Sequence, residues 1–64
     1  MPDLMLKELR LKHAQLELRA EKLRISARYV PGTSHRALSL AREARETQEQ
    51  ADAYAALIKQ AEAS

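Results

Sequence analysis

The side chains that could carry out chemistry are few. His13 is followed four residues later by Glu17, a spacing that places both on one face of a helix, where they could offer two ligands to a metal ion. No second histidine lies near them in the sequence. A polar residue at one position of an otherwise apolar helix-packing pattern commonly sets the register of the packing. We therefore predict that His13 sets the register of the packing or is a partly exposed histidine, and we predict no metal site.

The sequence gives little support for a catalytic nucleophile either. The chain has no cysteine, and its serines lack a nearby histidine and acid, except that Ser34 precedes His35. Residues adjacent in sequence have the wrong geometry for a catalytic triad. With a single glycine, the chain also has no glycine-rich phosphate loop. The sequence thus predicts a protein that is not an enzyme, with no catalytic residues, no cofactor and no small-molecule substrate.

Positive charge is concentrated in the middle of the chain. No acidic residue occurs from position 22 to position 42, and the cations there are Lys22, Arg24, Arg28, Arg36 and Arg42. If two helices meet near position 32, these side chains gather at the turn and form a basic tip, with Arg24, Arg28 and Arg36 as its predicted contact residues. Such a tip could bind phosphates or an acidic protein surface. The alternative is that Arg24 and Arg28 merely offset the negative end of the preceding helix dipole.

The element that positions these residues is an apolar pattern over residues 4–30. Its members alternate spacings of three and four, which is the heptad pattern of a helix that packs on another helix. They are Leu6, Leu9, His13, Leu16, Ala20, Leu23, Ala27 and Val30. The pattern predicts a helix over 3–30 with one apolar seam.

The same segment carries a second apolar row on its opposite side. Leu4, Leu11, Leu18 and Ile25 recur every seven residues and fall at the heptad position farthest from the seam. A two-helix hairpin alone would leave them in water, and four in one row are harder to dismiss than single exposed leucines. We therefore predict that this row is a second packing surface for another copy of the chain or for a different protein.

A second helix is predicted after a short break. Pro31 and Gly32 interrupt the first pattern, and Thr33 or Ser34 can cap the next helix. The second seam consists mostly of small residues: Ala37, Leu40, Ala41, Ala44, Thr47, Gln48, Ala51, Tyr54, Ala55, Ile58 and Ala61. Its two polar members should find hydrogen bonds or lie at the edge of the seam.

These patterns predict an all-α fold, a single domain over 1–64 with helix 3–30, turn 31–34 and helix 35–62. A link this short makes neighbouring helices antiparallel, so the chain is a coiled-coil helical hairpin. A chain of 64 residues buries a small core, and without cysteine it has no disulfides, so association is the remaining means of stabilisation. We expect a homodimeric four-helix bundle. No apolar run of 18 residues occurs, and we expect a cytoplasmic protein without a membrane partner.

The length and the two-helix pattern resemble those of Rop, the plasmid-copy-number regulators whose helical hairpins dimerise into a four-helix bundle. No sequence motif is shared, so no residue role is carried over. The expected function is that of a small regulator or adaptor, of the kind that phages and plasmids encode, which binds a larger protein and inhibits or reshapes it. One alternative is a Rop-like dimer that binds RNA or DNA through basic residues. Another is a structural coiled-coil subunit of a larger assembly.

Overall fold

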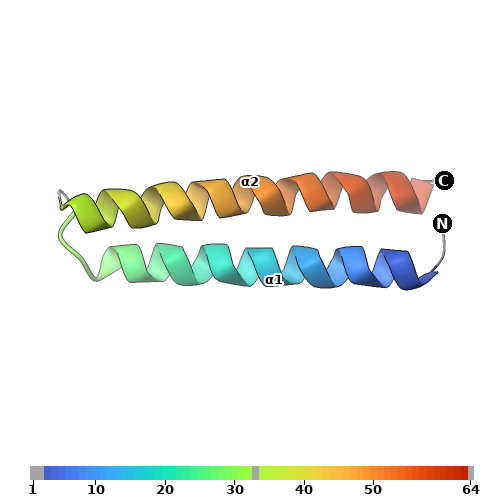
Figure 1. Cartoon of the computed structure of the whole chain (residues 1–64), viewed down its shortest axis with the longest axis horizontal. Helices are drawn as coiled ribbons and strands as arrows, with labels where there is room; N and C mark the ends of the chain where they lie inside the picture. Colours follow the sequence, from blue (N-terminus) through green and yellow to red (C-terminus); the bar gives the residue numbers. More distant parts are fainter. Residues whose placement is uncertain (1–2, 33, 64) are drawn as a thin grey trace.

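The chain folds into two long helices that lie side by side and run in opposite directions (Figure 1). The computed structural model describes residues 3–32 and 34–63. Helix α1 spans Asp3–Arg28 and helix α2 spans His35–Ala63, and the Cα atoms occupy a rod of 46 × 14 × 11 Å. The prediction of an all-α antiparallel hairpin is thereby confirmed.

The link between the helices is closed by hydrogen bonds around Ser34. Its hydroxyl accepts from the backbone N–H of Ala37 at 3.1 Å and donates to the Pro31 carbonyl at 2.8 Å. Ser34 is therefore the N-cap of α2, as predicted, because its side chain satisfies an N–H that has no partner within the helix. The other predicted cap, Thr33, lies outside the described residues.

Helix α1 ends two residues earlier than predicted. The Tyr29 N–H donates to the Ser26 carbonyl at 3.2 Å, a tight i to i−3 bond that closes the last turn, and Arg28 is the last helical residue. The predicted end at Val30 was wrong because a residue before proline is pushed out of the helical region. At the other end of the hairpin, α2 continues one residue past the predicted position 62, to Ala63.

The contact between the helices buries only small side chains completely. Ala20 and Ala51 are 0% exposed, and the other buried residues are Ala37, Ala44 and Thr47. Three of these alanines recur every seven residues on α2, so one line of small side chains allows α1 to approach closely. The leucines of the α1 seam lie on either side of that line and are half-buried. Two helices therefore do not suffice to enclose a large apolar residue here.

The second seam differs from its prediction at one position. Ala41 is exposed, whereas the remaining predicted seam residues of α2 are buried or half-buried. It lies at the margin of the contact, next to Arg24 and Arg45 in a surface groove. Within the described residues, neither helix has a stretch apolar enough to cross a membrane.

Candidate functional site

The outer face of α1 carries a row of large apolar side chains that the hairpin leaves exposed. The predicted row, which we call the outer row, consists of Leu4, Leu11, Leu18 and Ile25, and these side chains are 67%, 60%, 53% and 42% exposed. A spacing of seven residues advances a helix by almost two full turns, so all four project from one side of α1. Because the seam with α2 lies on the opposite side, the packing of the two helices leaves these side chains about half exposed.

The outer row is large enough to favour association. Full burial of a leucine or isoleucine side chain contributes about 1.5–3 kcal/mol. Since each member is already about half-covered, a partner that covers the rest would add roughly 3–6 kcal/mol per chain, before the cost of association. The outer face of α2 differs, because its exposed leucines, Leu38 and Leu57, are 19 positions apart and do not form a row.

One shallow groove extends the outer row around α1 towards the seam. Leu11 of the row lines it together with Met5 and Leu9 of α1 and Tyr54 of α2. Glu8, Lys12 and Gln15 line it as well, and helical geometry places these polar side chains between Leu11 and Leu9. The groove therefore connects the outer face of α1 to the junction with α2 through a mixed apolar and polar surface near the open end of the hairpin.

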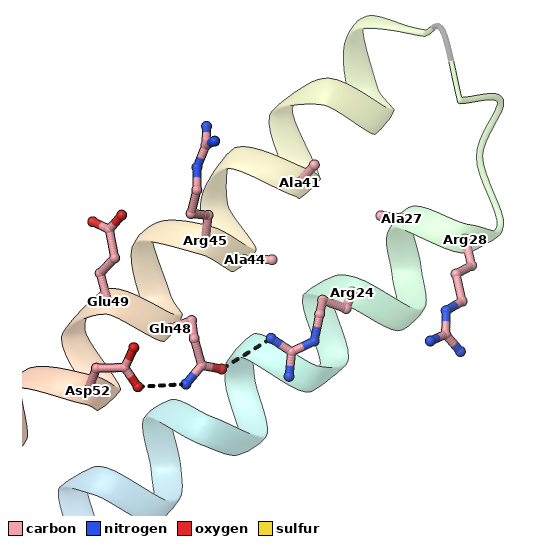
Figure 2. A pocket seen from close by; sticks show the side chains of 9 residues that line it. All are labelled: Arg24, Ala27, Arg28, Ala41, Ala44, Arg45, Gln48, Glu49 and Asp52. Carbon is pink, nitrogen blue, oxygen red and sulfur yellow. Dashed lines mark hydrogen bonds between the residues drawn. The ribbon is translucent and has the colours of Figure 1, made fainter. Parts of the chain in front are cut away.

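A second groove lies nearer the turn and contains part of the predicted basic tip (Figure 2). A chain of hydrogen bonds crosses it, in which Arg24 Nη1 donates to Gln48 Oε1 at 3.1 Å and Gln48 Nε2 donates to Asp52 Oδ1 at 3.2 Å. Gln48 thus has the partners expected of a polar residue in the seam. Because Asp52 and Glu49 share this groove with Arg24, Arg28 and Arg45, its charge is mixed and not purely basic.

The three predicted tip residues do not all line this groove. Arg24 and Arg28 line the groove near the turn, but Arg36 does not. Arg36 precedes Tyr54 by 18 residues, a whole number of helical turns, so both project from the same flank of α2. Tyr54 lines the groove that contains Leu9 and Leu11, so this flank of α2 lies on the side of that groove. Gln48 instead lines the groove near the turn, on the opposite flank. Arg45, which sequence reasoning missed, joins Arg24 instead, and its position one turn before Gln48 and Glu49 is the signal that could have identified it.

His13 is half-buried at the seam, and its Nε2 lies 2.8 Å from Glu17 Oε1. The spacing of four residues does bring the two side chains together, as the sequence indicated. Within residues 3–32 and 34–63, no group of three or more histidine, cysteine, aspartate or glutamate side chains is arranged to hold a metal ion. The pair is thus a local contact on one helix face.

Comparisons with protein-family models, with curated proteins and with solved structures find no match for this chain.

Proposed function

We propose that this chain is a small non-enzymatic regulator or adaptor that binds a larger protein through the outer row of α1. The observation that supports this function is the exposure of four large apolar side chains in one row on a helix of 26 residues. Apolar rows at heptad spacing fit a groove or a helix on a partner protein. A chain of this size acts on its target by occupying or reshaping a surface of that target.

The surfaces near the outer row support a protein partner better than a small molecule. Both grooves are shallow and lie on the outside of a two-helix rod, whereas small-molecule sites are enclosed pockets that bury most of their ligand. The outer row extends along most of α1, a helix of 26 residues or roughly 39 Å. An extended apolar strip of this length is suited to a helical or grooved protein surface.

The test is capture of a partner by the native chain and by two matched variants. In Leu11→Glu/Leu18→Glu, two central members of the outer row become charged, whereas Leu38→Glu/Leu57→Glu makes the same changes on the outer face of α2. We expect a stoichiometric partner to bind the native chain and the α2 variant and to be lost from the α1 variant. Retention by the α1 variant, with its helicity unchanged, would rule out the outer row as the binding surface.

Nucleic-acid binding is the alternative, and salt separates the two. Attraction to phosphates weakens steeply as salt concentration rises, whereas binding through an apolar row responds little. The acidic side chains of Glu49 and Asp52, which line the same groove as Arg24 and Arg28, reduce the attraction of this groove for a phosphate backbone. Binding of RNA or DNA that Arg24→Gln/Arg28→Gln abolishes, and that is lost between low and high salt, would favour the alternative.

A further inference from the structure

The charged residues beside the outer row are arranged symmetrically about its centre. On a helix, the residues three and four positions after each member lie on either side of the row. After Leu4 they are Lys7 and Glu8, after Leu11 they are Ala14 and Gln15, and after Leu18 they are Glu21 and Lys22. Arg28 and Tyr29 follow Ile25, and they lie past the last member of the row, outside this symmetric set. The order of the two charges therefore inverts around the uncharged Ala14–Gln15 pair.

These charges are available to a partner. Lys7, Glu8, Glu21 and Lys22 are all exposed. Across the described part of the chain, the ion pairs of α1 involve other residues, namely Arg10 with Glu62 and His13 with Glu17. The hairpin thus leaves an apolar row with charged residues on both sides, and none of these four charges has an ion-pair partner among residues 3–32 and 34–63.

We propose that the occupant of the outer row is a second copy of this chain, whose α1 runs antiparallel to the first across a two-fold axis at Ala14–Gln15. In this register Leu11 packs on Leu18 of the second copy, and Leu4 packs on Ile25. A two-fold axis perpendicular to the helices brings the same side of the outer row together in both copies. On one side Glu8 therefore faces Lys22 of the second copy, and on the other side Lys7 faces Glu21 of the second copy. Each contact occurs twice, and all four pairs join opposite charges. The inference rests on the proposed role of the outer row as a binding surface.

The centre of this interface has suitable residues. Ala14 faces Ala14 of the second copy, and its small side chain lets the helices approach closely. Gln15 faces Gln15, and two side-chain amides can each donate to and accept from the other. The row is also nearly centred in α1, which spans Asp3–Arg28, so an antiparallel partner overlaps almost the whole helix.

Charge at the ends of α1 selects the antiparallel arrangement over the parallel one. A parallel pair would place the two turn ends side by side, and the segment from Lys22 to Arg42 contains cations and no acidic residue. An antiparallel pair places that end beside the open end of the second copy, where Arg28 lies near Asp3. Repulsion between the two basic turn ends disfavours the parallel pair, and attraction between Arg28 and Asp3 favours the antiparallel pair.

The geometry of this dimer differs from the four-helix bundle expected from the sequence. Because the outer row lies on the side of α1 opposite α2, joining two hairpins through it places the helices in the order α2, α1, α1, α2 in one layer. A four-helix bundle around a shared core would instead need the two hairpins to contact each other through a side formed by both α1 and α2. The dimer also covers the surface proposed for the target protein, so dimer and target compete for the outer row.

Sedimentation of the native chain and of charge-reversed variants tests this register. We expect a species of twice the 7.2 kDa chain mass, and each of Glu8→Lys and Lys22→Glu should weaken the dimer about tenfold by setting like charges opposite each other. Mixing the two variants should restore the dimer, because the reversed residue of each then faces its opposite on the other. In a parallel pair Glu8 would instead face Lys7 and Lys22 would face Glu21, so mixing would not restore it.

A distance measurement checks the orientation independently. The chain has no cysteine, so a spin label on Ser26→Cys, at an exposed position outside the outer row, is unique. The antiparallel register separates the two labels by about 35 Å along the helices, whereas a parallel pair brings them within about 20 Å. A short distance, failure of mixing to restore the dimer, or a native chain that sediments as a monomer would each overturn the proposal.

The outcome is separable from that of the proposed function. Glu8→Lys and Lys22→Glu keep all four apolar side chains of the outer row, so capture of a target protein can be measured on the same variants. A monomeric native chain that still binds its target through Leu11 and Leu18 would refute the dimer and keep the function. A dimer in the stated register that binds no target protein would refute the proposed function and keep the dimer.

Discussion

Arg10 Nη2 lies 2.8 Å from Glu62 Oε2, which joins the two helices near the open end of the hairpin across 52 positions of the sequence. The side chains are 53% and 50% exposed, so water screens the interaction. The pair nonetheless occurs where the hairpin has no covalent link between the helices, and it opposes fraying of the last turns of α2.

Arg10→Gln and Glu62→Gln should therefore each lower the free energy of unfolding by only about 0.2–1 kcal/mol. A double-mutant cycle in urea measures the coupling between the two residues, which should shrink further in 1 M salt as charges are screened. A coupling above about 2 kcal/mol would show that the pair is shielded from solvent.

Ser34→Ala should destabilise the hairpin by about 1 kcal/mol, because the Ala37 N–H loses the hydroxyl that accepts from it at 3.1 Å. Urea denaturation followed by circular dichroism measures the change. Ser39→Ala is the matched control, since Ser39 is exposed in the interior of α2, where alanine is the better helix former. Equal stability of the two variants would contradict the capping role of Ser34.

Ala51→Leu should lower the free energy of unfolding by about 1–3 kcal/mol, because a side chain that is 0% exposed leaves no room for a larger one between the helices. Thermal melts provide the measurement. Ala53→Leu adds the same atoms at an exposed position two residues later and should change stability little. If Ala51→Leu melted as the native chain does, the close approach of α1 and α2 at Ala51 would be wrong.

The features that the sequence predicts well are those that depend on local periodicity. Both seams and the outer row follow from residue spacing, because a helix converts spacing directly into direction. A cap at Thr33 or Ser34 follows from residue type after the Pro31–Gly32 break. Ala41 was misplaced because it lies at the margin of its stripe, where spacing alone does not decide between contact and solvent. The end of α1 was overestimated because the heptad pattern continues to Val30 although the backbone before Pro31 does not.

The contacts that escaped prediction are those between long side chains on different helices. Arg10–Glu62 and Arg24–Gln48 depend on how far α1 is shifted along α2, which no single helix specifies. The basic tip was inferred from closeness in sequence, and this criterion groups Arg36 with Arg24 and Arg28 although helical direction separates them. The same criterion overlooked Arg45, which is distant from Arg24 in sequence but shares its groove.

His13→Leu should stabilise the hairpin, because it replaces a half-buried polar ring in a leucine-lined seam with an apolar side chain of similar size. The gain should be about 1 kcal/mol, since covered apolar surface contributes favourably and the exposed contact with Glu17 contributes little. Thermal melts of His13→Leu and of Glu17→Gln separate the contribution of the covered apolar surface from that of the His13–Glu17 contact. His35→Leu, a change at an exposed position, is the control for added hydrophobicity alone.

If His13→Leu instead lowered stability as much as Glu17→Gln, the His13–Glu17 contact would be a larger stabilising factor than its exposure implies. If His13→Leu raised stability but gave a mixture of assemblies, His13 would be acting as the residue that sets the register of the seam, at a cost in stability.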